Sequence, residues 1–532
     1  MAGRRKALGG LFVIALLSAP ALGTTTSGSF LLDWTDRVGN THPLISTQVS
    51  VYDNSSGVAT LVGTWVTDAT GKMTFSTNYE RADKSALQLS VVVKAAVTNV
   101  GTAGVNFGDV YTYQMPGTYT VNDGSFGTTF NAGAVGNNND AGKAVGFMQG
   151  LRVENAYYAS LGAQAPSVQV RFAPQWGNGS DTNGTSITLG YDSWGTWDAM
   201  FHEYGHAIAN TNALHVEQTI GATHSFNQDN ISDPKGPMLG AVAGTQFAWQ
   251  EGIASYMGTS AMNRAVPGAI SGMPASDTNT SYDRFSSTGN VTLDNSSQFS
   301  VDLENRTGTV GATSYVVPGQ GEGDELSVAR VLWDLRDNTP GEQYPRAGRS
   351  DQVSLGDQGV FNLLKAVGAG DNGRMSDLWK QARLVAGTTP LTRSLLGDVF
   401  EANGVSSVPG AAGGVADGGS TLATEPVLAW TKQNSGHSTM FEVAVYSQDW
   451  SSLLELSPEV DGATSWQLTS PLGIGTYNWV VISNSVMQNS VSFDDSYWSG
   501  GASFSIVAPE PGGMVAVGML VCLMRRRIPR GN

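Results

Sequence analysis

The segment Trp197–Ile208 (WDAMFHEYGHAI) constrains the chain more than any other, because its two histidines are four residues apart. In an α-helix such residues lie on one face, so His202 and His206 can point toward the same ion. Glu203 lies one step round the helix, where it can reach a water on that ion without binding the ion itself. The pattern H-E-x-x-H therefore predicts a helix that carries a metal site.

The residue inventory leaves few other ways to build a reactive site. The only cysteine, Cys522, lies in the last apolar stretch, so the folded part has no disulfide and no thiolate ligand or nucleophile. The chain has only six histidines, at positions 42, 202, 206, 215, 224 and 437. Two imidazoles one helical turn apart suit Zn²⁺, which takes a third protein ligand and keeps one position for water.

The third ligand is expected on a later helix. The three-histidine pattern of the metzincins needs a histidine at position 212, but that residue is Asn212, and His215 is out of phase. Glu251 opens the helical segment WQEGIASY at 249–256, in which small residues at 252 and 254 allow a close approach to the histidine helix. The alternative is that Glu251 is an ordinary glutamate favoured by the helix dipole.

The two motifs together resemble the gluzincins, metallopeptidases whose second motif reads roughly Glu-Gly-x-Ala-x-Tyr/Phe. Segments 324–336 and 395–404 resemble two helices that follow the zinc site in fungalysin-like enzymes, and the resemblance covers about 137–408. It implies that Zn²⁺ is held by His202, His206 and Glu251. It also implies that Glu203 is the general base that takes a proton from the attacking water.

Two positions depart from this family's pattern. Thermolysin-like and fungalysin-like enzymes use a histidine, often with a tyrosine, to stabilise the oxyanion, but no histidine lies in or near 324–336. Four residues after the ligand glutamate, thermolysin-like enzymes have an aspartate that supports the zinc site, whereas this chain has Ser255. The support of the site must therefore differ. The candidates for the oxyanion donor, none of them placed by a motif, are Tyr256, Tyr315, His224 and His215.

Both ends of the chain are predicted to be targeting segments. Residues 1–23 combine a basic start, a short apolar run and small residues at the end, which is typical of a secretory signal peptide. Residues 509–532 begin with Pro-Glu-Pro, continue with an apolar stretch at 512–524 and then carry arginines, which resembles the PEP-CTERM sorting signal of Gram-negative bacteria. The resemblance implies processing by an exosortase, transient membrane contact through 512–524, and a place at the cell surface or in the extracellular matrix. A permanent C-terminal anchor is the alternative.

The segments between these ends predict a multidomain protein with an α+β zincin-like metallopeptidase core between two β-sandwiches. Short alternating segments with turns dominate before residue 135, and strand-like segments with Trp430 and Trp479 as core aromatics after residue 426 fit a fibronectin III or immunoglobulin-like sandwich. The expected domains are a signal peptide 1–23, an N-terminal β-sandwich 24–135, a metallopeptidase domain 137–408, a linker 409–426, a fibronectin III/Ig-like β-sandwich 427–508 and a sorting tail 509–532.

Helical patterns are concentrated in the central region. Ser186–Gly190 precedes the histidine helix and has two equally supported interpretations. It is either an ordinary edge or core strand, or the edge strand on which a peptide substrate lies. Asp140 is expected to cap the first helix. The expected helices are 140–161, 196–210, 248–261, 324–337, 360–369, 375–385 and 392–404.

Charge and motifs leave two functional hypotheses. The formal net charge of −16 argues against a nucleic-acid partner, which needs a basic surface. The leading hypothesis is a secreted, surface-sorted zinc endopeptidase acting on polypeptides, and an intact Glu203 favours it. The alternative is a surface or biofilm-matrix binding protein on an inactive peptidase-like scaffold. The Asp- and Asn-rich turns at Asn137–Asp140 and Asp229–Asp233 could bind Ca²⁺, although turns of this kind usually have no bound ion.

Overall fold

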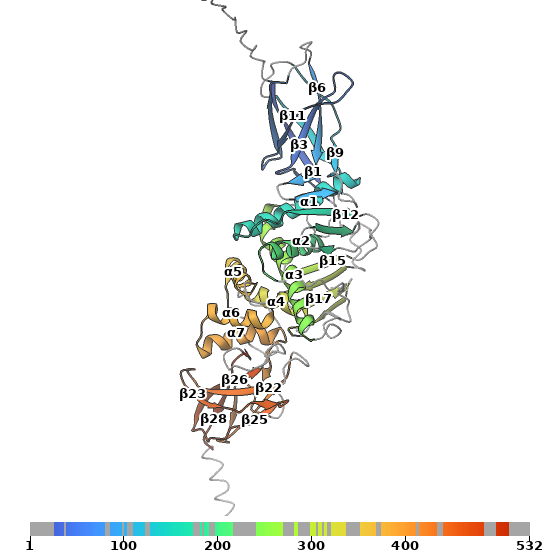
Figure 1. Cartoon of the computed structure of the whole chain (residues 1–532). Helices are drawn as coiled ribbons and strands as arrows, with labels where there is room; N and C mark the ends of the chain where they lie inside the picture. Colours follow the sequence, from blue (N-terminus) through green and yellow to red (C-terminus); the bar gives the residue numbers. More distant parts are fainter. Residues whose placement is uncertain are drawn as a thin grey trace, which may run out of the picture. The chain divides into compact units, whose positions relative to one another are not determined.

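The chain folds as a mixed α+β protein in two compact units (Figure 1). The first unit comprises Met1–Asp33, Pro43–Val93 and Gln114–Ala134, and the second comprises Trp34–His42, Lys94–Tyr113 and Val135–Asn532. The computed structural model describes residues 26–36, 39–79, 86–97, 100–103, 110–122, 128–173, 181–182, 186–190, 197–215, 241–269, 281–285, 298–304, 307–310, 313–316, 321–336, 352–368, 374–410, 414–433, 440–483 and 496–509. Residues 1–25 and 510–532, which hold the expected targeting segments, lie outside these ranges.

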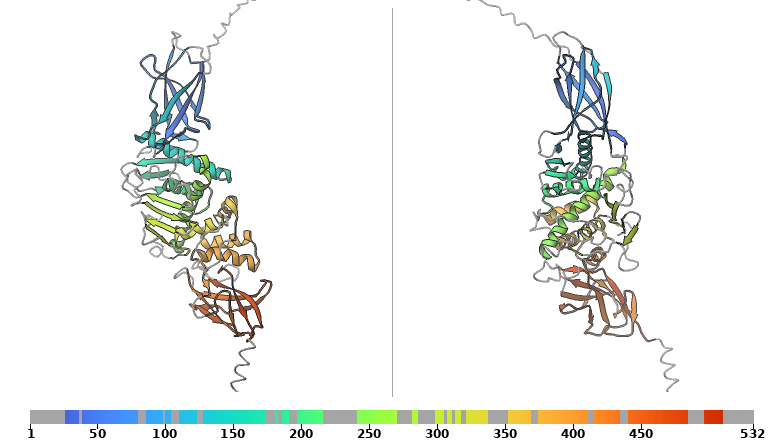
Figure 2. Two further views of the ribbon diagram at one scale, coloured as in Figure 1. Left: turned by 180° about the vertical axis from the view of Figure 1, so that it is seen from behind. Right: turned by 90° about the vertical axis from the view of Figure 1, so that its right-hand side faces the viewer.

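Two sheets contain most of the strands of the first unit, and Figure 2 shows them as two layers. One has the order β11-β1-β2 with β5 paired to β1, and the other has the order β10-β6-β3-β4 with β9 paired to β6. The strands are β1 (Thr26–Thr35), β2 (Thr41–Pro43), β3 (Gln48–Asp53), β4 (Thr60–Val66), β5 (Lys72–Thr77), β6 (Leu87–Lys94), β9 (Thr112–Gln114), β10 (Tyr119–Val121) and β11 (Thr128–Val135).

Alternating apolar residues bind these two layers together. On β3, Val49 and Val51 are fully buried while their neighbours are half-buried, as period-2 patterning requires. Phe30 of one sheet meets Tyr119 of the other edge to face, with ring centroids 5.0 Å apart. Aromatic contacts of this kind add to the apolar area buried between the sheets.

The first unit does not occupy one continuous stretch of sequence. The expected N-terminal sandwich covers 24–135, but Lys94–Tyr113 belongs to the second unit. In that segment β8 (Val100–Ala103) pairs in parallel with β12 (Val168–Ala173), more than sixty residues later in the chain. Local patterns could not indicate this pairing, because a parallel partner is always distant in sequence.

The central sheet of the second unit has the order β13-β14-β12-β8-β7. Its remaining strands are β7 (Ala96–Val97), β13 (Asp181–Thr182) and β14 (Ser186–Gly190). Because β14 pairs in parallel with β12 on one side and antiparallel with β13 on the other, it is not an edge strand among the described residues. The interpretation of Ser186–Gly190 as an edge strand is therefore wrong, and the short β13 occupies that position.

Seven helices are described, and they confirm the helical predictions to within a few residues except at α3, which is longer at both ends. The N-cap of the first helix is Asn139, whose side chain accepts the Gly142 N–H at 2.8 Å, rather than the expected Asp140. The helices are α1 (Asp140–Ser160), α2 (Trp197–Thr211), α3 (Ala241–Ala269), α4 (Glu325–Asp334), α5 (Gly356–Gly368), α6 (Met375–Ala386) and α7 (Pro390–Ala402). A separate antiparallel sheet consists of β15 (Ser281–Phe285), β16 (Gln298–Asp302), β17 (Thr307–Val310) and β18 (Thr313–Val316).

Strands after residue 407 form two further sheets around one apolar cluster. Trp430 and Trp479 are buried in that cluster, as expected, and the ring of Trp430 lies 5.9 Å from that of Phe441. The expected linker 409–426 contains two short strands, β19 (Val408–Pro409) and β20 (Gly419–Thr421). The others are β21 (Val427–Thr431), β22 (Met440–Ser447), β23 (Leu453–Leu456), β24 (Val460–Asp461), β25 (Ser465–Gln467), β26 (Gly475–Ser483), β27 (Tyr497–Trp498) and β28 (Ala502–Ile506).

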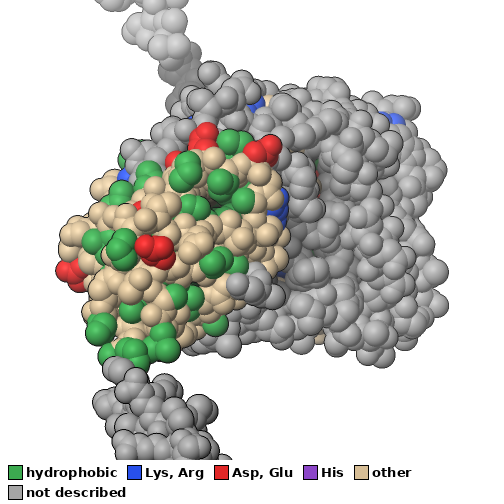
Figure 3. Space-filling model, turned by 90° about the horizontal axis from the view of Figure 1, so that it is seen from below, with side chains coloured by type: hydrophobic (Ala, Val, Ile, Leu, Met, Phe, Trp, Pro, Cys, Tyr) green, Lys and Arg blue, Asp and Glu red, His purple; other side chains and the backbone are tan. Residues whose placement is uncertain are grey.

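The outer surface of these C-terminal strands is largely neutral. Figure 3 shows exposed apolar side chains spread among uncharged ones, with a few acidic groups between them. Apolar side chains scattered in this way are normal on a solvent-facing surface. Among the described residues, no helix is both long enough and apolar enough to span a bilayer.

Helix α7 packs directly against β27, so the helical region and the C-terminal strands belong to one compact unit. A Cβ on Gly397 would lie only 2.2 Å from the Ser499 carbonyl oxygen, so glycine is required for this approach. Glu401 accepts the Gly500 N–H at 2.9 Å, and the Tyr497 hydroxyl donates to Glu322 at 2.8 Å. These buried hydrogen bonds fix the contact in one arrangement.

Glu154 on α1 is fully buried without a hydrogen-bond partner in the described part of the chain, and burial raises its pKa well above 4.5. The folded state therefore keeps its proton while the unfolded chain loses it above about pH 4.5, so this group costs stability as pH rises. We expect Glu154→Gln to raise the free energy of unfolding at pH 7 but not at pH 4. Chemical denaturation at both pH values, with the exposed Glu425→Gln as control, tests this. An equal effect at both pH values would contradict it.

Candidate metal centre

Helix α2 presents the predicted motif inside the protein. His202, Glu203 and His206 are only 3%, 8% and 4% exposed, and Phe201, on the same helix, is fully buried. On the side of α2 that faces α1, the Tyr204 side chain is buried near Glu154, and burial is the main cause of its raised pKa. The helix is therefore packed on several sides and holds its histidines in fixed positions.

Three side-chain atoms from two helices converge at one point. Glu251 on α3 places Oε2 3.1 Å from Nε2 of His202 and 3.1 Å from Nε2 of His206. The two Nε2 atoms are themselves 3.1 Å apart. Glu251 is 5% exposed, so all three groups are shielded from water. The structure thus brings together the three residues that the sequence predicts as ligands.

This arrangement suits a metal ion better than a set of hydrogen bonds. One carboxylate oxygen could accept a hydrogen bond from each ring, but the two ring nitrogens would still face each other at contact distance. Donor atoms around a tetrahedral ion with bonds of about 2.1 Å lie about 3.4 Å apart, close to the observed spacing. The buried His202, His206 and Glu251 could therefore hold a metal ion, and they form the only such group among the described residues.

Small residues let the helices approach closely enough for this convergence. A Cβ on Gly205 of α2 would lie 3.2 Å from the Ala254 carbonyl oxygen of α3. A Cβ on Gly258 of α3 would lie 3.1 Å from the backbone nitrogen of His202. The expected role of the small residue at 254 is therefore confirmed. Gly252 has a different role from the one expected, since it faces α4, where a Cβ would lie 2.5 Å from Val328 Cβ.

Helix α4 is itself held at its N-terminus by a buried carboxylate. Asp324 accepts the Ser327 N–H at 3.1 Å and the Ser327 hydroxyl at 2.6 Å. Burial raises the pKa of Asp324 to about 6, while these bonds and Arg330 act in the opposite direction. When this carboxylate is ionised, its negative charge stabilises the N-terminal end of the helix.

Ser255 supplies a contact that the sequence motifs did not indicate. It lies four residues after Glu251, on the same face of α3, and its Oγ is 3.1 Å from Nδ1 of His202. When Nε2 of His202 serves as a ligand, the Nδ1 proton donates to this hydroxyl, which fixes the ring's orientation and tautomer. The i+4 spacing was the available signal, but the small neutral side chain gave no reason to expect a support role.

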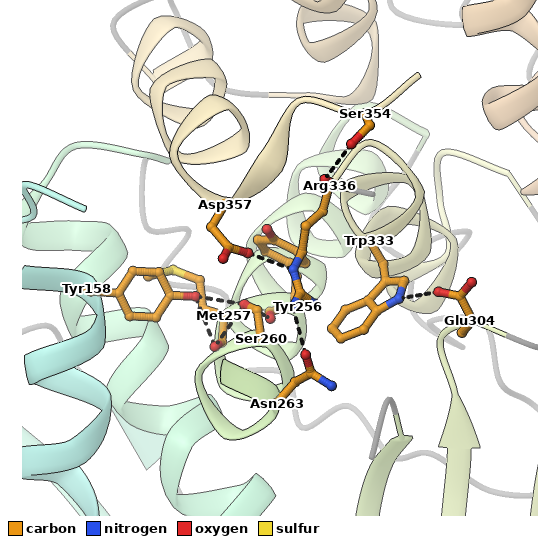
Figure 4. A network of polar contacts seen from close by, with 10 residues as sticks. All are labelled: Tyr158, Tyr256, Met257, Ser260, Asn263, Glu304, Trp333, Arg336, Ser354 and Asp357. Atoms are coloured by element: carbon orange, nitrogen blue, oxygen red, sulfur yellow. Dashed lines mark hydrogen bonds and ion pairs between the residues drawn. The ribbon is translucent and has the colours of Figure 1, made fainter. Parts of the chain in front are cut away.

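Tyr256 lies in a cluster around Arg336, shown in Figure 4. Arg336 is 1% exposed and forms an ion pair with Asp357 at 2.6 Å and a hydrogen bond with Asn263 at 2.7 Å. Its guanidinium lies 4.2 Å from the ring centroid of Trp333. Burial acts to lower the pKa of Arg336, but Tyr256 and Asp357 raise it, and the pKa lies above its ordinary value.

The other candidates for the oxyanion donor have separate locations. His215 is buried, with its ring centroid 6.2 Å from that of His206, beside the group but outside it. Tyr315 lies on β18, and His224 lies outside the described residues. Of the two turns considered for Ca²⁺, Asn139 at 137–140 uses its side chain to cap α1, and 229–233 lies outside the described residues.

A larger residue at position 252 should disturb the metal centre through the contact between α3 and α4. In Gly252→Ala the new methyl would meet Val328 and, at 2.6 Å, the Glu325 carbonyl oxygen, so α3 must shift and move Glu251. We expect the free energy of unfolding to fall by about 1–3 kcal/mol and the affinity for metal to decrease. Thermal melting and metal titration measure the two effects. Gly473→Ala is the control, since its methyl would lie 3.9 Å from the Tyr477 hydroxyl oxygen, an ordinary van der Waals contact.

Removing the Ser255 hydroxyl should weaken metal binding without unfolding the protein. Ser255→Ala removes the hydroxyl that contacts Nδ1 of His202 and helps to orient the ring, so we expect metal affinity to fall about tenfold or more. Competition with a chromogenic chelator measures the affinity. Thr259→Val is the matched control, because the Thr259 hydroxyl donates only to the Ser255 carbonyl at 2.9 Å. Equal loss in both variants would show a packing effect instead.

Comparisons with known proteins assign no family to this chain. No family profile and no curated protein matches it. Among solved structures, an (S)-allantoin synthase is 14% identical with a TM-score of 0.13, covering 21% of this chain and 42% of that one. A 9R-lipoxygenase from Cyanothece PCC8801 is 9% identical with a TM-score of 0.15, covering 73% of this chain and 51% of that one. The chain thus spans about half the length of each of these proteins or less.

Proposed function

We propose that this chain is a zinc-dependent endopeptidase whose central region, about 137–408, is a zincin-like metallopeptidase domain. The observation that carries the proposal is the convergence of His202, His206 and Glu251 in a buried group, with Glu203 next to His202 on the same helix. Two imidazoles and one carboxylate are a ligand set that suits Zn²⁺ and leaves a position for water. Bound there, zinc would supply a polarised water and a Lewis acid for the substrate carbonyl.

Glu203 is the residue assigned to proton transfer. On an α-helix it lies about 100° from His202 and about 60° beyond His206, so it borders the ligand face without sharing it. Its side chain is the most exposed of the four, at 8%. In this position the carboxylate accepts a proton from the attacking water and returns it to the leaving amine. The same role explains why a glutamate stands beside the first ligand.

Export and sorting are further parts of the proposal and rest on the sequence. The signal-peptide pattern at 1–23 and the PEP-CTERM-like tail at 509–532 favour an exported protein processed at its C-terminus by an exosortase. The cysteine-free body and net charge of −16 are compatible with an extracellular setting. Under this proposal the substrate is a polypeptide at the cell surface or in the extracellular matrix.

The test measures zinc content and peptide cleavage separately in the wild type and in three variants. We expect the purified chain to hold about one zinc, measured by mass spectrometry, and to cleave an unfolded protein in a chelator-sensitive way. Glu203→Gln should keep the zinc and lose cleavage by about 10²–10⁴-fold. Glu251→Ala should lose both. The exposed Glu425→Gln, which removes a charge far from the helix in sequence, should change neither.

Two outcomes would contradict the endopeptidase. One is zinc-loaded wild-type protein that cleaves nothing across a broad peptide library. The other is a Glu203→Gln variant with full biological activity, which would favour the alternative of a surface or matrix binding protein on an inactive scaffold.

A further inference from the structure

The outer face of one sheet in the first unit contains a groove of about 510 Å³ that the proposed peptidase site does not use. Its floor is the pair Tyr52 and Ser90, which lie directly opposite each other on β3 and β6. Figure 1 labels these two strands. One wall is the loop after β3, with Asn54 and Ala59, and the other is the 114–118 segment between β9 and β10. The groove thus lies within a single unit and is formed entirely by described residues.

The walls of this groove are held in place by backbone bonds. The Asn54 N–H donates to the Gln88 carbonyl at 2.8 Å, and the Gly57 N–H donates to the Asn54 carbonyl at 3.0 Å, which closes a turn. On the other side, the Met115 N–H donates to the Val91 carbonyl at 2.9 Å. Gly117 has a φ of +107°, a conformation that favours glycine. The shape of the groove is therefore built into the fold.

The groove is lined by uncharged polar groups next to apolar ones. Among its lining residues there is no lysine, arginine, aspartate, glutamate or histidine. An anion or a cation would find no opposite charge there, so the chemistry favours a neutral ligand. The lining residues are Tyr52, Asn54, Ala59, Ser90, Val92, Gln114, Met115, Pro116, Gly117 and Thr118.

Two of these polar groups have no hydrogen-bond partner among the described residues. Ser90 is only 7% exposed, yet neither its hydroxyl nor the side-chain amide of Asn54 hydrogen-bonds to any group in the described part of the chain. A wholly apolar ligand would leave such groups unsatisfied, at a cost in binding energy. Hydroxyl groups on the ligand would satisfy them, and the Tyr52 ring offers an apolar surface beside them.

From this lining we propose that the groove binds a neutral saccharide, whose hydroxyl groups bond to Ser90 and Asn54 and whose C–H faces lie against Tyr52. A ligand of this class alternates hydroxyl and C–H surfaces at short spacing, as the lining does. The site would attach the chain to a neutral polysaccharide, independently of any hydrolysis at the metal centre.

The experiment uses the full chain in native affinity gels that contain one polysaccharide each. The neutral probes are laminarin, dextran and hydroxyethylcellulose, and alginate serves as the anionic comparison. We expect retardation in at least one neutral gel and none in alginate. Tyr52→Ala should weaken the binding roughly tenfold or more, and Asn54→Ala should weaken it as well. Glu203→Gln should bind as the wild type does, which separates this site from the proposed catalysis.

Ser50→Ala is the matched control. Ser50 lies two residues before Tyr52 on the same strand, and its hydroxyl contacts Thr64 at 3.0 Å outside the groove. Thermal melting confirms that each variant is folded, and Asn54→Ala carries the test if Tyr52→Ala unfolds. Migration unchanged in every neutral gel would overturn the proposal. So would retardation only by alginate, or binding that both groove variants retain.

Discussion

The close approach of helix backbones around α3 is the constraint on which the metal centre depends. Glycines at 205 and 258 bring α2 and α3 together, and Gly252 does the same for α3 and α4. Only at this separation can a glutamate side chain from one helix reach two imidazoles on the next. The three donor atoms at 3.1 Å spacing are thus a product of small residues that carry no chemistry themselves.

Helix α3 separates two polar clusters that would interfere with each other if they were adjacent. One face carries Glu251 and Ser255 toward the histidines, while Tyr256, about 100° further round, joins the cluster of Arg336 and Asp357. A buried guanidinium beside the donor group would compete for the Glu251 carboxylate. Arg336 instead lies on the Tyr256 side of the helix and pairs with Asp357 at 2.6 Å, which removes that competition.

Sequence patterns predicted the local elements of this protein well and its long-range pairings poorly. Helical periodicity predicted that His202 and His206 share a face, and the resemblance of the motif around Glu251 to a family motif predicted the third residue of the converging group. The oxyanion donor stayed unassigned, because nothing in a sequence shows which of several tyrosines and histidines a fold brings to a pocket. The role of Gly252 was also missed, since its partner, Val328, lies on a helix more than seventy residues later.

The parallel pairing of β8 with β12 has a consequence for how the chain can be divided. The polypeptide leaves the first unit at residue 94, contributes a strand to the sheet beside α1, and returns at residue 114. No single proteolytic cut can therefore release the first unit as an intact, detachable prosegment. A cleavage near residue 135 that removed everything before it would also strip β8 from the sheet and leave the backbone of β12 exposed along a new edge.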